Sequence, residues 1–342
     1  TGIWRSFRKI KAMKFLKGLG IFLLLLIIVY FLGPKPSTPR YHKELPDVPT
    51  EAAALEQYIK KEEAKHKIKP DNEARIIWYD DSVKQKTEYA IVYLHGFSAS
   101  QEEGDPVHYE FTQKFGCNLY LSRLDAHGID TSAPLASFTA EGVWNSAKEA
   151  YAIAKQLGNK VIIMSTSTGG TLALKLAAEF PEIAGLVLLS PNIAINDPNA
   201  WLLNNHWGLQ IAHLVTGKYR TVADTTAIYA QYWNNRYVTK SLVQLEELLE
   251  TTMKESTFKK ITQPVLLLYY FKDEEHQDPV VKVSAMKRMF RQLGTPENRK
   301  REVPVPNAGD HVIGSYIKSK DHQAVLAECE KFATEVLKMY QR

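Results

Sequence analysis

One serine in this sequence stands in a context suited to nucleophilic catalysis. Ser167 lies within Met164–Gly170 (MSTSTGG), between an apolar run and a helical pattern. Small residues on both sides of Ser167 allow a strained turn, which lifts the hydroxyl above the end of a strand and directs the N–H groups of a helix N-terminus at it. Ser165 falls at the end of the strand rather than at the apex of the turn. Taken alone the pattern is also typical of a helix-capping turn, and we predict Ser167 as a nucleophile because other pieces accompany it.

A histidine and two competing aspartates follow later apolar runs. His311 comes after residues 300–305, and a serine hydroxyl needs a neutral imidazole to take its proton during attack. Asp273 and Asp278 both come after residues 264–270. The two valines after Asp278 can pack under the edge of a sheet and fix the direction of its carboxylate, and the longer loop that Asp278 requires has little entropic cost. We predict that Asp278 orients His311 and keep Asp273 as the alternative acid.

Two backbone N–H groups are placed to stabilise the charge that this attack develops on a carbonyl oxygen. Residues 89–94 lead into His95-Gly96-Phe97-Ser98, and Thr168 directly follows the predicted nucleophile. We expect the N–H groups of Phe97 and Thr168 to form the oxyanion hole, where losing one donor costs about 3 kcal/mol.

The order of these pieces along the chain is itself informative. Oxyanion loop, nucleophile, acid and histidine each follow a successive predicted strand. Over residues 74–340 this arrangement resembles the α/β-hydrolase superfamily, and within it lysophospholipase-like and monoglyceride-lipase-like serine esterases with an inserted cap. His127, in the stretch RLDAHG, stands where those enzymes carry a His-Gly turn. The resemblance implies hydrolysis of esters without a cofactor.

The elements that must position these residues alternate along the chain. Short apolar strands separated by amphipathic helices predict a mostly parallel sheet with helices on both faces. The predicted strands are 74–79, 89–94, 117–122, 160–164, 185–190, 264–270 and 300–305, and the predicted helices are about 51–67, 107–115, 141–157, 169–180, 280–292 and 321–340. Residues 192–263 are mostly helical in pattern and too long for a simple crossover, so we expect an inserted cap.

Four further residues are candidates for the substrate pocket. His95 and His127 belong to the two His-Gly turns, although a buried histidine with purely structural hydrogen bonds is the commoner case for both. Trp201 and Trp207 lie in the predicted cap. An apolar wall formed by these tryptophans would favour acyl chains over charged peptides; the alternative is that they form the small core of the cap itself.

Other chemistry has less support. Glu102, Glu103 and Asp105 could bind a substrate ammonium, as a peptidase requires, but we expect them to lie in a solvated loop. The sequence contains no HExxH, Walker lysine or GxGxxG motif, and its two cysteines cannot form a four-ligand zinc site. We predict neither a metal nor a cofactor.

The positive charge of the chain is confined to a leader. The 342 residues carry a net charge of +5, but residues 1–43 contain nine Lys and Arg and no acid, so the remainder has 34 bases and 38 acids, a net charge of −4. The body therefore lacks a basic surface of the kind that binds nucleic acid, and we predict no nucleic-acid partner.

The leader contains a candidate membrane segment. Leu19–Leu32 (LGIFLLLLIIVYFL) carries no charge; it is short for a spanning helix of about 20 residues, but Lys17 can snorkel so that residues 15–32 span a bilayer. Six bases precede the run, so the positive-inside rule places the catalytic domain on the periplasmic or cell-surface side. The run ends without a small-x-small cleavage site, so we predict an uncleaved anchor; secretion after signal cleavage is the alternative.

The sequence thus divides into a basic leader and anchor (1–33), a Pro-rich linker with a helix (34–70) and a hydrolase domain (71–342) with its cap at 192–263. We predict an exported serine hydrolase that cleaves lipid-like carboxylic esters through an acyl-enzyme. A peptidase or amidase of the same fold and a catalytically inactive, membrane-tethered binding scaffold are the alternatives.

Overall fold

A seven-stranded sheet forms the centre of the computed structural model, which describes residues 2–342 and, at positions 2–6, 8–10 and 12, the backbone alone. The strand order is β1-β3-β2-β4-β5-β8-β9, and β1 is antiparallel to β3 while the other pairs are parallel. Each strand overlaps one predicted from the sequence, so the prediction of a mostly parallel sheet is confirmed. The strands are β1 (Arg75–Ile77), β2 (Thr87–Leu94), β3 (Asn118–Leu121), β4 (Gly158–Thr166), β5 (Gly185–Leu189), β8 (Val265–Tyr269) and β9 (Lys300–Pro304).

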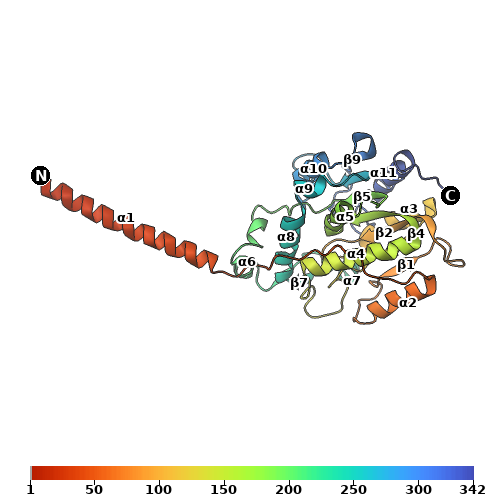
Figure 1. The fold of residues 1–342 in the computed structure, drawn as a ribbon, viewed down its shortest axis with the longest axis horizontal. Helices are drawn as coiled ribbons and strands as arrows, with labels where there is room; N and C mark the ends of the chain where they lie inside the picture. Colours follow the sequence, from red (N-terminus) through yellow and green to blue (C-terminus); the bar gives the residue numbers. More distant parts are fainter. Residues whose placement is uncertain (1) are drawn as a thin grey trace.

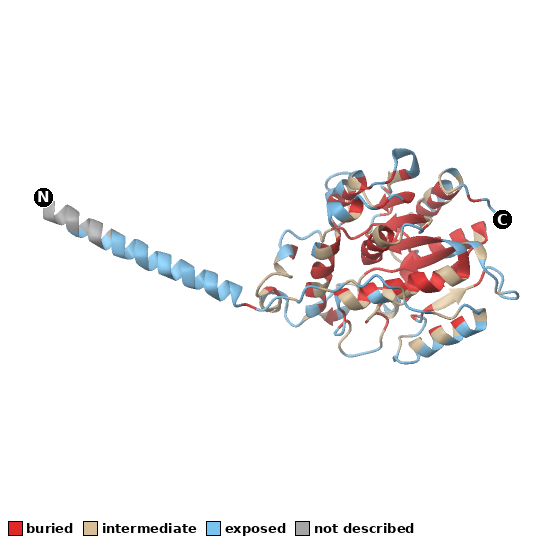
Figure 2. Ribbon diagram, in the orientation of Figure 1, coloured by how far each residue is buried: buried red, intermediate tan, exposed pale blue. Residues whose placement is uncertain are grey.

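The sheet has an apolar core on each face. Along β4, Ile163 packs on one face and Met164 on the other, because successive side chains of a strand point in opposite directions. Figure 2 shows the buried residues concentrated in the sheet and in the helix faces that cover it. Helices α4 (Ala140–Leu157), α5 (Thr168–Glu179) and α10 (Val283–Gln292) cover one face, and α3 (Val107–Phe115) and α11 (His322–Glu335) cover the other.

Residues 192–263, which we call the cap, connect β5 to β8. The predicted helical character is present, but a two-stranded antiparallel sheet, β6–β7, interrupts it. The cap lies over the loop that follows β2, because the N–H of Asn234 donates to the carbonyl of Ser98 (2.8 Å) and the rings of Tyr237 and Phe97 are 5.3 Å apart. Its elements are η2 (Ala200–Leu202), α6 (Gly208–Thr216), β6 (Tyr219–Thr221), α7 (Ala227–Tyr232), β7 (Arg236–Val238), α8 (Lys240–Thr252) and α9 (Glu255–Phe258).

The Pro-rich linker is packed against the body rather than free. The indole N–H of Trp144 on α4 donates to the carbonyl of His42 (2.8 Å), and the Lys148 ammonium donates to that of Glu44 (2.9 Å). The following helix, α2 (Ala52–Glu63), ends four residues earlier than predicted. The linker therefore fixes where α2 lies on the body.

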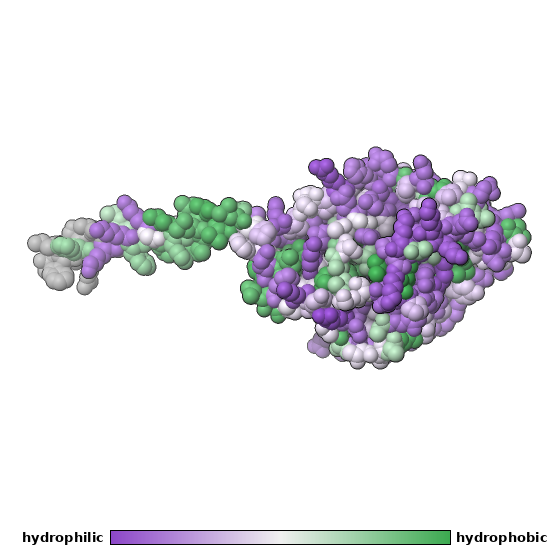
Figure 3. All heavy atoms as spheres, turned by 90° about the horizontal axis from the view of Figure 1, so that it is seen from below, coloured by the Kyte–Doolittle hydropathy of each residue, from purple (hydrophilic) through white to green (hydrophobic). Residues whose placement is uncertain are grey.

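Helix α1 (Gly2–Phe31) projects from the end of the body that carries α6 (Figure 1). Met13–Phe31 has a mean hydropathy of 2.2 and none of it is buried. By length and composition this stretch could cross a membrane or act as a signal sequence. Figure 3 shows that its apolar surface continues up to the body. Thr1 and the side chains of Arg5, Arg8 and Lys9, which belong to the predicted basic leader, lie outside the described part of the chain.

Candidate active site

Ser167 stands at the apex of the turn between β4 and α5. Its backbone has φ 53° and ψ −118°, outside the regions that residues with side chains normally adopt. Two hydrogen bonds support this conformation: the N–H of Ser167 donates to the carbonyl of Leu189 (3.1 Å), and its carbonyl accepts from the N–H of Asn192 (2.9 Å). Ser165, by contrast, is fully buried within β4.

Two glycines after the serine allow the backbone segments to approach this closely. A Cβ on Gly169 would lie 1.9 Å from the carbonyl oxygen of Leu94 at the end of β2, and a Cβ on Gly170 would lie 2.5 Å from Cβ of Pro191. Helix α5 can therefore begin directly at the serine. Because Ser167 is the N-cap residue of α5, the unpaired N–H groups of the first helical turn lie beside it.

The structure brings His311 and Asp278 together at the ends of β9 and β8. Nδ1 of His311 lies 2.6 Å from Oδ2 of Asp278, and Oδ1 of Asp278 accepts the N–H groups of Val280 (2.9 Å) and Val281 (3.0 Å). The valines thus hold the carboxylate through their backbone. The expected packing of their side chains applies only to Val281, because Val280 is 49% exposed. A carboxylate fixed in this way keeps the imidazole proton on Nδ1 and leaves the Nε2 lone pair free.

Asp273, the alternative acid, lies in an exposed loop. Its carboxylate accepts the ring Nδ1 of His276 (2.8 Å) and the N–H of Glu275 (3.0 Å). The hydrogen bond from His276 lowers the pKa of Asp273. Among the described residues, none of its hydrogen bonds reaches His311.

The protonation of His311 is set by opposing influences. Burial lowers its pKa, but the charge and hydrogen bond of Asp278, with a smaller contribution from the charge of Glu103, raise the pKa above the ordinary value of 6.5. Nε2 of His311 is buried and has no hydrogen-bond partner among the described residues. The bond from the serine hydroxyl is therefore not formed here; such catalytic hydrogen bonds often tighten only when substrate binds.

Phe97 and Thr168 lie on two segments that meet at Ser167. Thr168 is the first residue of α5, so its N–H has no acceptor one turn earlier in the helix. Phe97 follows Gly96, and a Cβ on Gly96 would lie 2.9 Å from Cβ of Ser167. Both backbone N–H groups thus come from segments adjacent to the serine.

His95 and His127 make structural hydrogen bonds behind this loop. Nε2 of His95 accepts the N–H of Leu124 (3.0 Å), and its Nδ1 pairs with a neighbouring carbonyl (2.9 Å), so both nitrogens are engaged. His127 also bonds a carbonyl through Nδ1 (2.8 Å), and burial lowers its pKa to about 4. Its ring centroid lies 6.0 Å from that of Phe97. Neutral His127 therefore packs edge-on against Phe97 in the loop after β2.

The structure places Trp201 and Trp207 at the surface of the cap and against α1. Trp201 is 55% exposed, and the indole N–H of Trp207 donates to the carbonyl of Val29 in α1 (3.0 Å). These contacts give no support to the expected pocket wall. The buried tryptophan of this region is Trp233, which stacks on Tyr229 at a ring distance of 5.3 Å.

The expectation of a solvated acidic loop is wrong for Glu102 and Glu103, whereas Asp105 is partly exposed. Glu102 and Glu103 lie in the short 3-10 helix η1 (Gln101–Gly104) and are 8% and 3% exposed. Burial raises the pKa of Glu103 to about 7, although the N–H of Gly96 and the charge of His311 act in the opposite direction. Sequence reasoning missed Glu103 because a run of charges normally indicates a solvated surface.

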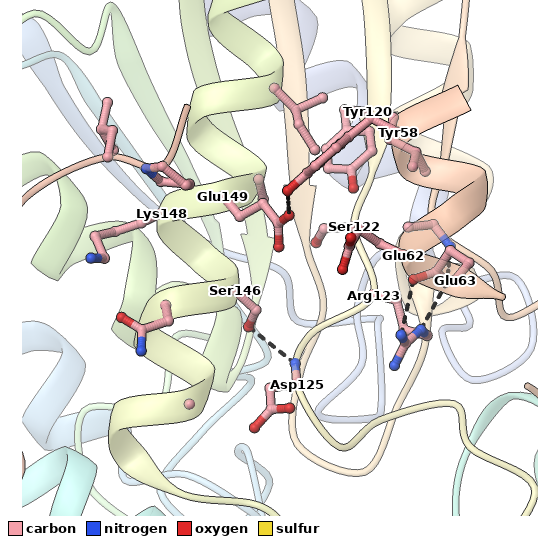
Figure 4. Close-up of a pocket in the computed structure, with 18 of the residues that line it drawn as sticks. Tyr58, Glu62, Glu63, Tyr120, Ser122, Arg123, Asp125, Ser146, Lys148 and Glu149 are labelled. Atoms are coloured by element: carbon pink, nitrogen blue, oxygen red, sulfur yellow. Dashed lines mark hydrogen bonds and ion pairs between the residues drawn. The ribbon is translucent and has the colours of Figure 1, made fainter. Parts of the chain in front are cut away.

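A separate cleft of about 660 Å³ lies between α2, α4 and the loop after β3 (Figure 4). Several of its polar groups are already engaged: Arg123 binds both carboxylate oxygens of Glu63 (2.8 and 2.9 Å), and the Tyr58 hydroxyl donates to Glu149. We therefore assign no ligand to this cleft. Within residues 2–342, no group of three or more His, Cys, Asp or Glu side chains is placed to hold a metal ion.

A strained serine turn and a His–Asp pair at successive strand ends of a mostly parallel sheet define an α/β hydrolase. A model of the alpha/beta hydrolase family matches residues 91–328, and the chain belongs to this family. A thermostable monoacylglycerol lipase of Bacillus sp. (strain H-257) is 26% identical over 189 residues, which are 55% of this chain and 71% of that protein.

Solved structures share the fold at low sequence identity. A structure of the metagenome-derived lipolytic enzymes LipS and LipT superposes with a TM-score of 0.62 at 17% identity, covering 78% of this chain and 98% of that one. A monoacylglycerol lipase of Paleococcus ferrophilus gives 0.53 at 16% identity, covering 76% and 98%. Est1E of Butyrivibrio proteoclasticus with bound ferulic acid gives 0.53 at 17% identity, covering 78% and 95%.

Proposed function

We propose that this chain is a serine hydrolase that cleaves carboxylic esters through an acyl-enzyme, with Ser167 as nucleophile, His311 as general base and Asp278 as the orienting acid. The observation that carries the proposal is the 2.6 Å pair between His311 and Asp278, in a chain whose Ser167 occupies the strained turn at the start of α5. This combination serves to activate a hydroxyl, since a serine alone is a weak nucleophile at neutral pH.

The proposed reaction proceeds in two halves. Nε2 of His311 takes the Ser167 proton as Oγ attacks the ester carbonyl, and the imidazolium then protonates the departing alcohol. Water, deprotonated by the same nitrogen, next hydrolyses the acyl-enzyme. The N–H groups of Phe97 and Thr168 stabilise the oxyanion in both halves, and Asp278 stabilises the imidazolium.

A lipid-like ester is the substrate class that we propose. Two of the similar proteins are named monoacylglycerol lipases. In addition, α6 carries apolar side chains at the surface, with Leu214 88% and Val215 78% exposed. The residue that precedes α6, Trp207, contacts α1. If α1 lies in a membrane, this apolar surface faces the lipid that supplies the substrate.

The decisive experiment is labelling with a fluorophosphonate probe, followed by hydrolysis assays on p-nitrophenyl esters and aminoacyl anilides. We expect wild-type protein to react, Ser167→Ala to lose both labelling and hydrolysis, and Ser165→Ala to retain them. Absence of labelling in wild-type protein would favour an inactive binding scaffold. Faster cleavage of the anilides would favour a peptidase or amidase.

We further propose that α1 anchors the enzyme with its catalytic domain on the periplasmic or cell-surface side. The exposed apolar stretch Met13–Phe31 supports this arrangement. Membrane fractions should then contain the full-length chain, and added protease should reach the body only from the extracytoplasmic side. A soluble mature form that begins after Gly33 would instead indicate a cleaved signal and a secreted enzyme.

A further inference from the structure

Glu103 is a buried carboxylic acid beside the proposed catalytic serine to which the mechanism above gives no role. It is 3% exposed, and its Oε2 accepts the backbone N–H of Gly96. Gly96 directly precedes Phe97, whose N–H we assign to the oxyanion hole. The carboxyl of Glu103 is thus one residue away from an oxyanion donor.

The geometry at Gly96 shows how closely these groups are packed. A Cβ on Gly96 would lie 2.8 and 2.9 Å from the two carboxyl oxygens of Glu103 and 2.9 Å from Cβ of Ser167. The acid and the nucleophile therefore both crowd the space that a side chain at position 96 would occupy, and no larger residue can stand there without a shift of one of them. Glycine has the widest choice of backbone conformations, so the two peptides that flank Gly96 each need a restraint. The carbonyl of Gly96 pairs with Nδ1 of His95 (2.9 Å), and the N–H of Gly96 donates to Glu103.

Hydrogen bonds join η1, which carries Glu103, to the loop after β9, which carries His311 and which we call the histidine loop. The Ser315 hydroxyl donates to the carbonyl of Glu102 (3.0 Å), and the N–H of Tyr316 donates to the carbonyl of Asp105 (2.9 Å). η1 therefore cannot move independently of the loop that bears His311.

The cap closes over the same acid. The Trp233 side chain lies close enough to the Glu103 carboxyl to lower its pKa against the effect of burial. Trp233 itself packs with Ala99, Tyr229 and Val312, the residue after His311. Glu103 thus lies where the oxyanion loop, the histidine loop and the cap meet.

We propose that Glu103 is a positioning residue that holds the His95–Gly96 peptide through the Gly96 N–H and so helps to direct the N–H of the next residue, Phe97, into the oxyanion hole. The inference rests on the proposed serine hydrolase function. It assigns Glu103 no contact with substrate; its effect on the reaction passes through Phe97.

The restraint operates in both protonation states of the acid. An anion next to the oxyanion hole opposes the transition state, but a neutral carboxyl still accepts the Gly96 N–H through its carbonyl oxygen. When Glu103 is ionised, its charge helps to raise the pKa of His311. The groups that interact electrostatically with Glu103 are Tyr93 on β2, Tyr229 on α7, and His311 and Asp310 on the loop after β9.

Three substitutions separate the hydrogen bond from the charge. Glu103→Gln keeps an acceptor for the Gly96 N–H without charge, Glu103→Asp keeps the charge on a side chain too short to reach it, and Glu103→Ala removes both. We expect Glu103→Ala and Glu103→Asp to lower kcat on a p-nitrophenyl ester by about 10²-fold, as for a lost oxyanion donor, with KM changed less than about threefold. The kcat of Glu103→Gln should stay within about threefold of the wild-type value. Exposed Glu110→Gln on α3 is the matched control and should leave kcat unchanged.

The pH profile gives a second readout that a purely structural role would not move. Because the Glu103 charge raises the pKa of His311, the acidic limb of kcat/KM should shift to lower pH in Glu103→Gln and stay in place in Glu103→Asp. If Glu103→Ala does not fold, the comparison of kcat between Glu103→Gln and Glu103→Asp is sufficient to test the inference. The inference is overturned if Asp or Ala retains the wild-type kcat, or if Gln is as slow as Asp. Wild-type protein that does not label at Ser167 would instead refute the proposed function itself.

Discussion

Replacing Asp278 with Asn tests whether its carboxylate sets the tautomer of the catalytic imidazole. In the wild-type chain, Oδ1 of Asp278 accepts two backbone N–H groups, from Val280 and Val281, while Oδ2 accepts from Nδ1 of His311. The two valine donors determine how an Asn amide can stand there: its oxygen must face them, so its NH₂ must face His311. Nδ1 then has to accept a hydrogen bond, and the ring proton moves to Nε2, the atom that should accept the proton of Ser167.

The wrong tautomer should lower kcat by about 10⁴, which corresponds to about 5.4 kcal/mol in the activation barrier. Folding should be preserved, because the Asn oxygen keeps both hydrogen bonds from the valines. The assay is kcat and KM on a p-nitrophenyl ester, with thermal unfolding measured in parallel. Asp273→Asn is the matched control; since Asp273 is exposed and bonds within its own loop, its kcat should stay within about twofold of wild type.

Two results would refute this reasoning. If Asp278→Asn stays near the wild-type rate while Asp273→Asn collapses, then Asp273 is the catalytic acid and the loop must rearrange on substrate binding. If Asp278→Asn loses activity only because its unfolding temperature falls sharply, then the valine hydrogen bonds do not orient the amide as argued.

Two further predictions follow from the same site. Asp278 raises the pKa of His311 above 6.5 in spite of burial, and only the neutral ring can accept the Ser167 proton. A plot of kcat/KM against pH should therefore rise through a limb that lies above pH 6.5. A limb below pH 6.5 would show that burial outweighs Asp278 in setting the pKa of His311. Gly169→Ala would place a Cβ 1.9 Å from the carbonyl oxygen of Leu94, so we expect it to lower the free energy of unfolding by about 3 kcal/mol. Gly20→Ala on α1, where a Cβ meets nothing within 4 Å, is the control and should leave this free energy unchanged. Denaturant unfolding of both variants checks the difference, and equal losses would argue against the close contact.

Local pattern was sufficient to predict the sheet and the order of the site along it. Each buried strand carries a run of apolar residues, and a parallel arrangement places the carboxyl ends of these strands at one edge of the sheet. The sequence therefore predicts that residues following β4, β8 and β9 lie close together. Strand ends were harder to predict. β4 begins at Gly158, two residues before the predicted start, because Gly158 pairs with Thr87 in the sheet although neither Gly158 nor Asn159 is a strand-forming apolar residue.

The cap was predicted less well because its structure depends on contacts distant in sequence. Strands β6 and β7 have three residues each, too few for a period-2 pattern to be recognised, and they pair Tyr219 with Val238 across the intervening helix α7. The same limitation applies to the tryptophans. Nothing in their sequence neighbourhood distinguishes Trp201 and Trp207, which lie at the surface and against α1, from Trp233, which is buried beside η1.

Glu103 shows the limit of sequence reasoning most clearly, and the energetic cost of its position argues for a role. A carboxyl group taken out of water without partners is strongly destabilising, and the segment Gln101–Gly104 would bury a leucine or glutamine more cheaply. The chain nevertheless places the acid against the N–H of Gly96, with Trp233 close enough to affect its pKa. A side chain that only fills space would not need a hydrogen-bond acceptor at the N–H of Gly96, the residue that precedes the proposed oxyanion donor Phe97. The burial of Glu103 is therefore better explained by the orientation of the Phe97 N–H than by packing alone. The kcat of the folded variants discriminates between these explanations, because a lost packing contact lowers stability whereas a misplaced Phe97 N–H lowers kcat.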